Sequence, residues 1–257
     1  MNSQITYNRQ FDKRMTILTV LAKYDHTALS IPQASEDIRP LFSKFSKDKP
    51  AKFFTSGKIL GIQLHSLKKL YASNYQEKII ANTSAWDTIL NQMQWFNKEC
   101  EIVNPFEDQK ILSVSSRLKK VFDCIDTNEK IAVSFSHGDI TPWNLNGDDK
   151  RLYRYNWETS DCGIPMLTDL FHFLFLPKTL STNHDFKTIK KSIDHAIGHS
   201  ICKSIIEKYR INVDLHYRIY LLFSITHYLR IYNSQKFSQM QLHRLMDIWN
   251  EALLELE

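Results

Sequence analysis

Two side chains near the middle of the chain have the types and the spacing that phosphoryl transfer requires. Asp139 ends the stretch Ser136–Asp139, and Asn144 follows it five positions later. A carboxylate can serve as the base for an attacking hydroxyl group, and a carboxamide oxygen can bind Mg²⁺. A second polar cluster, Asn156 and Glu158, follows after a short turn. The sequence therefore predicts a phosphoryl-transfer site around Asp139.

The segment before Asp139 is expected to be a strand that ends in a sharp turn. Residues 131–135 form a short apolar run, which is typical of a buried strand. Gly138 permits a backbone turn that a residue with a Cβ would resist. We therefore expect Asp139 to lie on a loop at the end of this strand.

A hairpin is expected after the loop. Residues 143–145 and 152–157 have the composition of strands, and the stretch Asn146–Lys150 between them is a strong turn signal. Such a hairpin would hold Asn144 on one strand and Asn156 on the next. Both side chains would then reach one ion near the catalytic loop.

Three ordered motifs in this region resemble the aminoglycoside phosphotransferase and choline kinase family, a branch of the protein-kinase-like fold. That family carries H-G-D-x-x-x-x-N, then a strand ending in I-D-W-E or similar, then a D-L pair that opens a helix. The corresponding residues here are His137–Asp139 with Asn144, then Tyr155–Glu158, then Thr168–Leu170. The first spacing also matches the catalytic loop of protein kinases. The fuller pattern, T-P-W-N at 141–144 with D-L-F-H-F at 169–173, looks most like phosphotransferase-like proteins of bacterial surface-glycan gene clusters.

The resemblance implies a role for each matching residue, with ATP and Mg²⁺ as cofactors. Asp139 would be the catalytic base. His137, two residues before it in the same motif, is also predicted to be catalytic. Asp169 would be a buried acceptor that supports the backbone of the catalytic loop. The implied ligands of Mg²⁺, and through it of the nucleotide, are Asn144, Asn156 and Glu158.

The second motif departs from the family at its metal-binding position. Where the family has an aspartate that binds Mg²⁺, this chain has Asn156. An asparagine still offers a carbonyl oxygen but lacks the negative charge that a hard cation prefers. Glu158 lies two residues further along the same strand and so faces the same side, where it can take over as a ligand. We expect weaker metal binding than in the family.

The front of the chain departs further. Helical apolar spacing begins at Phe11, so about ten residues precede the first predicted helix, too few for several strands of 5 or 6 residues each. No two of the six glycines form a G-x-G pair, so a glycine-rich phosphate loop is missing. The short front also leaves no strand to carry the lysine that contacts the phosphates. We interpret residues 1–52 as a remnant N-lobe helix and linker, and residues 53–257 as a kinase-like helical C-lobe. The lysine- and proline-rich stretch 36–52 is equally well explained as an ordinary surface loop.

Most of the remaining chain has helical periodicity. The expected helices cover residues 60–71, 86–96, 111–125, 170–176, 186–201, 215–232 and 239–256, with Pro177 ending the fourth. The predicted fold class is α+β and predominantly helical, with a kinase-like C-lobe, a short β-hairpin at the catalytic loop and a reduced or missing β-rich N-lobe. The aromatic side chains of the helix at 215–232 are better explained by core packing than by an acceptor pocket. His195 and His199 have zinc-pair spacing, but Ala196 replaces the glutamate that such a motif requires.

Composition limits the class of protein. The 257 residues are 43% hydrophobic and 24% charged, which is typical of a globular domain, and the net charge of +5 is mild. We therefore expect no nucleic-acid partner. The four cysteines are far apart, and neither a secretory signal nor an apolar stretch long enough to span a membrane is present. These features predict a cytoplasmic protein. The family resemblance implies a small-molecule acceptor as substrate, and no pattern indicates the oligomeric state.

Four interpretations remain open from sequence. The first is an ATP-dependent phosphotransferase that acts on a small hydroxylated acceptor, a sugar or an amino alcohol, in surface-glycan biosynthesis. The second is a pseudokinase or binding remnant without the nucleotide-clamping strands. The third is the product of a truncated gene whose missing strands lie upstream or come from a partner. The fourth is a helical interaction domain in which the H-G-D motif occurs by chance.

Overall fold

The computed structural model of the protein describes residues 57–102, 109–141, 144–147, 152–154, 157–181, 184–235 and 239–257. The predicted helix that begins at Phe11 and the predicted linker at 36–52 lie outside these ranges. Asn156 also lies outside them, whereas the other predicted site residues lie inside. The division between a remnant lobe and a main lobe stays a prediction.

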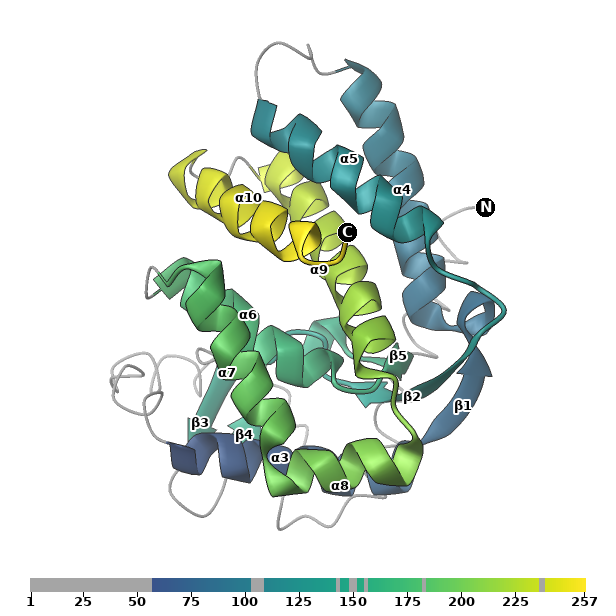
Figure 1. Ribbon diagram of the computed structural model, residues 1–257, viewed down its shortest axis with the longest axis vertical. Coiled ribbons are helices and arrows are strands. Elements are labelled where there is room, and N and C mark those ends of the chain that lie inside the picture. Colours follow the sequence, from purple (N-terminus) through teal and green to yellow (C-terminus); the bar gives the residue numbers. More distant parts are fainter. Residues whose placement is uncertain are drawn as a thin grey trace, which may run out of the picture.

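The described chain is built mainly from helices around a small sheet (Figure 1). The helices are α3 (Gly57–Asn74), α4 (Ser84–Ile102), α5 (Gln109–Asp123), α6 (Thr168–Ser181), α7 (Phe186–Gly198), α8 (Ser200–Tyr209), α9 (Val213–Gln235) and α10 (Gln239–Leu254). The strands are β1 (Gln76–Ile79), β2 (Lys130–Ser136), β3 (Leu145–Gly147), β4 (Leu152–Arg154) and β5 (Asp161–Pro165), and two short 3-10 helices are η2 (Ile80–Asn82) and η4 (Trp157–Thr159). The predicted α+β, predominantly helical class is confirmed.

The central strand of the three-stranded sheet leads into the candidate catalytic loop. The strand order is β1-β2-β5, and both pairings are antiparallel. All residues of β2 from Ile131 to Ser136 are buried, as the apolar run predicted. A register shift between Ser134 and Phe135 marks a bulge just before the loop, and a bulge of this kind bends and re-aims the end of a strand.

The predicted hairpin is present but starts later than expected. Strands β3 and β4 pair antiparallel, with Leu145 opposite Arg154 and Gly147 opposite Leu152. Asn144 therefore precedes β3 instead of lying on it, and its backbone N–H donates to the carbonyl oxygen of Thr141 in a tight turn. Strand β4 ends at Arg154, and Trp157 begins η4. The turn at Asn144 accounts for the later start, because it uses the backbone N–H in a local hydrogen bond.

The expectation that Pro177 ends a helix is wrong. Helix α6 continues through Pro177 to Ser181. A proline costs the helix one backbone hydrogen bond, but tertiary packing holds this segment, because Phe175 and Thr179 are both fully buried. The carbonyl oxygen of Thr179 also accepts a hydrogen bond from Nε of Arg244 on α10.

The single helix expected over 186–201 is divided into α7 and α8 at His199. His199 has extended backbone dihedrals, and its Nδ1 accepts the N–H of Ile201 at the start of α8. Gly198 precedes the break, and a glycine weakens a helix at that point. The histidine that zinc-pair spacing drew attention to therefore caps a helix.

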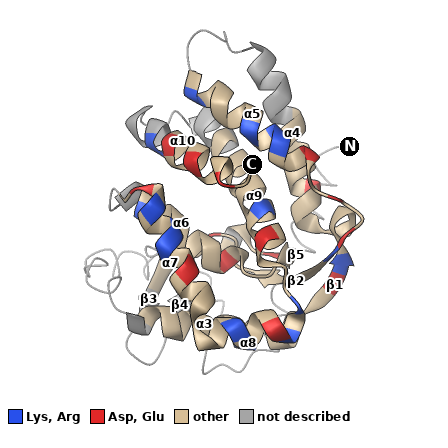
Figure 2. Ribbon diagram, viewed as in Figure 1, with Lys and Arg blue, Asp and Glu red and all other residues tan. Residues whose placement is uncertain are grey.

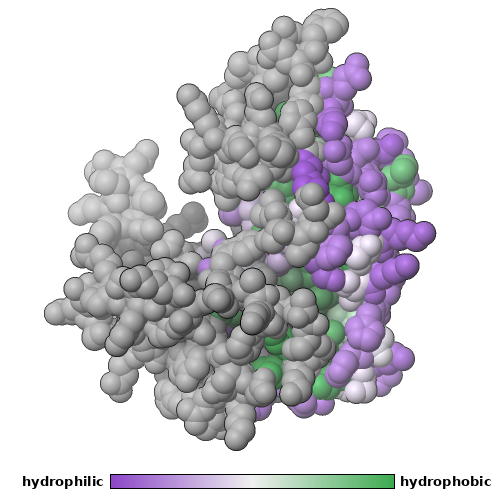
Figure 3. All heavy atoms as spheres, turned by 90° about the vertical axis from the view of Figure 1, so that its left-hand side faces the viewer, coloured by the Kyte–Doolittle hydropathy of each residue, from purple (hydrophilic) through white to green (hydrophobic). Residues whose placement is uncertain are grey.

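The main hydrophobic core contains buried residues of the sheet and of helices α3 to α10. Tyr217 and Tyr220 of α9 are buried, as the packing interpretation predicted, and Trp249 of α10 is fully buried. Helix α5 lies beside α10, where Lys110 forms an ion pair with Asp247. In Figure 3, hydrophilic side chains predominate along the right-hand edge of the coloured surface, and apolar ones lie mostly to their left.

Charged residues are spread over most of the described helices, with both signs interspersed (Figure 2). No broad face of one sign stands out among the described residues, which agrees with the mild net charge. None of the helices in the described part of the chain is long and apolar enough to cross a membrane.

His216 is buried at the start of α9 and links that helix to the sheet. Its Nδ1 lies 2.7 Å from the carbonyl oxygen of Asn212, and its Nε2 lies 3.1 Å from that of Ala132 on β2. Burial lowers the pKa of His216, although the hydrogen bonds to the two carbonyl groups act in the opposite direction. The folded protein therefore favours the neutral ring near neutral pH.

We predict that the folded protein loses stability as the pH falls through the ordinary histidine pKa of about 6.5. Below that value the unfolded chain binds a proton that folded His216 does not, and the loss continues down to the lower pKa of the folded state. Urea denaturation at about pH 7.5 and about pH 5.5, a span over which histidine titrates, measures this loss. His216→Asn should show a weaker pH dependence than the wild type, and His65→Asn, at an exposed position, should not. Equal pH dependence in all three proteins would contradict this account.

Candidate active site

The loop after β2 is held by the carboxylate of Asp169, in the first turn of α6. Oδ2 of Asp169 accepts the backbone N–H of His137 at 2.9 Å, and Oδ1 accepts that of Gly138 at 3.1 Å. Oδ1 also accepts the hydroxyl of Ser136 at 2.7 Å. Asp169 is 2% exposed, so three donors compensate a buried carboxylate that also lies favourably at a helix N-terminus.

The opposite side of the loop is fixed by Thr159 at the end of η4. Its hydroxyl donates to the carbonyl oxygen of His137 at 3.1 Å. Gly138 has a φ of +85°, and a Cβ placed there would lie 2.5 Å from the backbone oxygen of Thr159. Only glycine fits both the dihedral and the space. The loop is therefore held between α6 and η4.

The residue before α6 adopts a conformation that is unusual for a leucine. Leu167 has a φ of +70° and is fully buried. Its backbone N–H donates to the phenolic oxygen of Tyr71 on α3 at 2.9 Å. Such strain persists where the surroundings fix the chain. Here the strained residue lies directly before the first residue of α6, two positions before Asp169.

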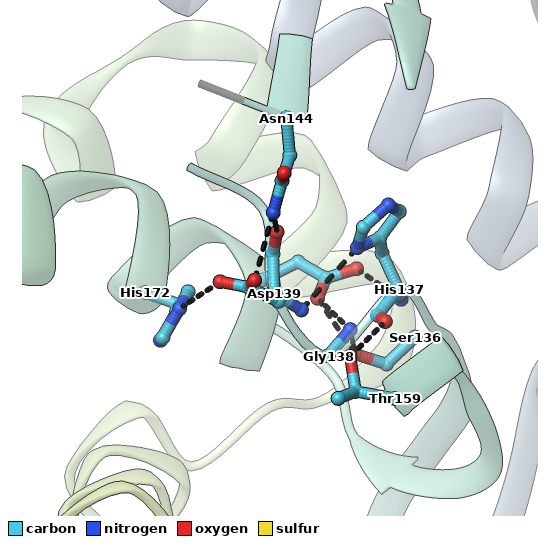
Figure 4. Close-up of polar contacts among 8 residues, drawn as sticks. Ser136, His137, Gly138, Asp139, Asn144, Thr159 and His172 are labelled. Carbon is cyan, nitrogen blue, oxygen red and sulfur yellow. Dashed lines mark hydrogen bonds and ion pairs between the residues drawn. The ribbon is translucent and has the colours of Figure 1, made fainter. Parts of the chain in front are cut away.

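Both carboxylate oxygens of Asp139 have a donor or ring-nitrogen partner (Figure 4). Oδ2 accepts from Nδ2 of Asn144 at 2.7 Å, and the same nitrogen lies 2.9 Å from the backbone oxygen of Asp139. Oδ1 lies 3.1 Å from Nε2 of His172 on α6. The Asp139 side chain is 32% exposed, so the carboxylate is oriented from within the protein and still reached by solvent.

The charge of Asp139 follows from these contacts. Burial raises its pKa, but the hydrogen bonds from His172 and Asn144 and the nearby imidazoles of His172 and His137 outweigh that effect. The net pKa lies below the ordinary value for an aspartate. The carboxylate is therefore ionised at neutral pH and can accept a proton or a hydroxyl hydrogen bond.

His137 lies under the loop, 1% exposed. Its Nδ1 accepts the backbone N–H of Asp139 at 3.3 Å, and its ring packs against Trp157 with centroids 4.4 Å apart. These contacts connect His137 to the backbone of Asp139 and to Trp157, and its catalytic role stays a prediction.

The hairpin that follows Asn144 is anchored to α3 by a buried arginine. Arg154 on β4 donates to Oε1 of Gln63 at 3.0 Å and to the hydroxyl of Ser66 at 2.7 Å. Arg154 is 6% exposed. Because β3 pairs with β4, this contact also fixes the start of β3 and the turn that carries Asn144.

The predicted metal ligands are placed only in part. Asn144 turns its amide nitrogen toward Asp139, and Figure 4 shows its oxygen on the far side of that nitrogen. Glu158 lies in η4, so the expected strand geometry that would place it beside position 156 is wrong. The position of its side chain, like Asn156, lies outside what the structure describes.

The oxygen donors of the predicted ligands are of the kind that Mg²⁺ binds. Among the described residues, no group of three His, Cys, Asp or Glu side chains is placed to hold a metal ion. Mg²⁺ requires fewer protein ligands, because it keeps several waters and is held by one or two protein groups together with phosphate oxygens. The oxygen of Asn144 and the carboxylate that Glu158 carries in the sequence match that pattern.

His172 is a site residue to which the sequence analysis gave no role, although it belongs to the D-L-F-H-F string at 169–173. In sequence it stood within the apolar run after Asp169 and had no assigned role. Residues three apart on a helix lie on the same face, so Asp169 and His172 both face the loop from α6. Helical spacing from Asp169 was the signal that could have found it.

Comparison with known proteins gives one distant likeness. A scan against models of known protein families found no match, and a search of curated proteins found no significant match. Among solved structures, the chain is similar to a glucosamine kinase (crystal form B), with 14% sequence identity and a TM-score of 0.46. The match covers 77% of this chain and 52% of that one, so the chain spans about half the length of that protein. The likeness is too distant to assign a function.

We predict that Gly138→Ala destabilises the protein by about 2–5 kcal/mol. The left-handed φ costs about 1–2 kcal/mol for a residue with a Cβ, and overpacking against Thr159 adds about 1–3 kcal/mol. Gly61→Ala is the matched control, because a Cβ there meets nothing within 4 Å. That helical substitution should stabilise the protein by about 0.5–1 kcal/mol. Urea denaturation of both variants tests this, and equal stabilities would contradict the described loop.

Proposed function

We propose that this protein is an ATP-dependent phosphotransferase that acts on a small hydroxylated acceptor. The observation that supports it best is the ionised carboxylate of Asp139, held between Asn144 and His172 on a loop that Asp169 fixes. The order H-G-D, N and D-L along the sequence adds the family resemblance. The acceptor class we favour is a sugar or an amino alcohol, with a cytoplasmic role in surface-glycan biosynthesis.

In the proposed reaction the acceptor hydroxyl lies against the carboxylate of Asp139. The oxygen of the acceptor hydroxyl forms a bond to the γ-phosphorus of ATP. The bond from that phosphorus to the β,γ-bridging oxygen breaks, which releases ADP. The hydroxyl proton passes to the Asp139 carboxylate and then to solvent. The 32% exposure of this side chain provides the route for that last transfer.

A lowered pKa at Asp139 is compatible with this role. Phosphoryl transfer passes through a loose transition state, so the nucleophile needs orientation more than early removal of its proton. An ionised carboxylate with two fixed partners supplies that orientation, because each carboxylate oxygen can accept more than one hydrogen bond. Asp139 thus positions the hydroxyl first and takes its proton late.

The residues that would hold Mg²⁺ are Asn144, Asn156 and Glu158, with the phosphates of ATP as further ligands. The ion would neutralise charge on the transferring group. What the chain itself does is to hold Asn144 at a fixed point, through its turn to Thr141 and its hydrogen bonds to Asp139.

A second candidate function is nucleotide binding without turnover. Asn156 favours it, because a neutral amide replaces the carboxylate that the resembled family uses for Mg²⁺. In this alternative the loop still forms and Asp139 is still oriented, but the metal is held too weakly for transfer.

We predict that Asp139→Asn lowers kcat by about 10²- to 10⁴-fold, the usual contribution of a positioned acid or base. The assay uses the full chain with ATP, Mg²⁺ and a panel of hexoses, amino sugars and amino alcohols, and measures ADP release and acceptor phosphorylation. Asp194→Asn is the control, because Asp194 lies on the outside of α7 in an i,i+4 ion pair with Lys190. Turnover that survives in Asp139→Asn, or phosphorylation of no acceptor by the wild type, would overturn the proposed function.

We predict that Asn156→Asp tightens Mg²⁺-dependent binding of ATP, because it restores a charged ligand for a hard cation. Isothermal titration calorimetry with a non-hydrolysable ATP analogue, with and without Mg²⁺, measures the change. Unchanged affinity in the presence of Mg²⁺ would show that position 156 does not contact the metal.

A further inference from the structure

His172 and Asp169 divide the support of the catalytic loop between them. Asp169 binds the backbone of the loop through the N–H groups of His137 and Gly138. His172, three residues later on α6, lies 3.1 Å through its Nε2 from the carboxylate of Asp139. One face of one helix therefore contacts both the backbone and the side chain of the loop.

The carboxylate of Asp139 is fixed because its two partners lie in different directions. Figure 4 shows His172 on one side of Asp139 and Asn144 on another. Rotation of the carboxylate lengthens the contact to Oδ1, the contact to Oδ2, or both. The two partners together select one orientation, and removal of either leaves the carboxylate free to turn.

His172 is itself held by aromatic rings of α9. Its imidazole stacks on Tyr228, with centroids 6.2 Å apart and planes inclined by 11°, and meets Tyr220 edge-on at 6.3 Å. Its side chain is only 6% exposed. These rings restrict the imidazole, so Nε2 stays directed toward Asp139.

We propose that His172 is a positioning residue. It fixes the carboxylate of Asp139 so that the carboxylate can orient the acceptor hydroxyl for attack on the γ-phosphorus of ATP. This inference rests on the proposed function, because orientation of Asp139 matters only if Asp139 receives that hydroxyl. The ring must present its N–H at Nε2, since the carboxylate is ionised and can only accept. Tyr228 stacks on the imidazole, and the negative charge of Asp139 adds to burial in raising the pKa of Tyr228.

The first experiment compares His172→Leu with His172→Gln in the phosphotransfer assay. We expect His172→Leu to lower kcat roughly 10- to 100-fold, the scale that misplacement of a reacting group by about 1 Å produces, with KM for ATP unchanged. Gln carries an amide N–H near the position of Nε2, so His172→Gln should recover most of the lost kcat. His195→Leu, at an exposed position of α7, is the matched control and should behave as the wild type.

The second experiment reads the tautomer of His172 by ¹⁵N NMR of labelled imidazoles, with His172→Gln used for assignment. We expect Nε2 to carry the proton in the wild type, and its ¹⁵N chemical shift to move in Asp139→Ala, where the hydrogen bond to the carboxylate is lost. This measurement needs no turnover, so it still decides the matter if His172→Leu fails to fold.

The outcomes separate this inference from the proposed function. If Asp139→Asn is inactive while His172→Leu keeps the wild-type kcat, the inference is wrong and the proposed function stands. If His172→Leu raises KM for ATP and leaves kcat unchanged, His172 serves nucleotide binding and the inference is also wrong. An Nε2 chemical shift that does not respond to Asp139→Ala overturns it as well. Activity that survives in Asp139→Asn overturns the proposed function, and the inference with it.

Discussion

The site depends on one buried carboxylate that accepts backbone N–H groups. A loop that reverses direction after a buried strand leaves amides without strand partners, and burying them unpaired costs free energy. Asp169 satisfies two of them at a helix N-terminus, where negative charge is also favourable. Because these hydrogen bonds hold the loop backbone, the side chain of Asp139 projects from the loop in a defined direction. The functional geometry is thus a consequence of satisfying buried backbone groups.

Contacts from other elements also fix the position of Asp169 and of the loop that it binds. The conformation of Leu167 sets the start of α6, and Tyr71 satisfies its N–H. Thr159 closes the loop from the other side, and Arg154 ties the hairpin to α3. Each is a contact between segments far apart in sequence. The hydrophobic core, to which the sheet and helices α3 to α10 contribute, brings these segments together, and the polar contacts then define the loop.

Local patterns predicted the elements better than the contacts between them. The strand before Asp139 and the hairpin after it follow from apolar runs and turn composition. The division of one helix at His199 and the continuation of another through Pro177 depended on capping and on tertiary packing, which periodicity does not report. His172 was missed because its role exists only once α6 packs against the loop. The spacing of Asp139 and Asn144 was informative because the turn from Thr141 to Asn144 brings the amide of Asn144 back to Asp139.

The proposed function requires that the carboxylate of Asp139, oriented by Asn144 and His172, faces the phosphate that is transferred. A crystal structure of the full chain with Mg²⁺ and a non-hydrolysable ATP analogue tests it most directly. We expect the γ-phosphate beside Asp139, with the metal against the amide oxygen of Asn144 and both contacts of the carboxylate intact. A nucleotide bound elsewhere, or an Asp139 side chain turned away from both partners, would contradict the claim.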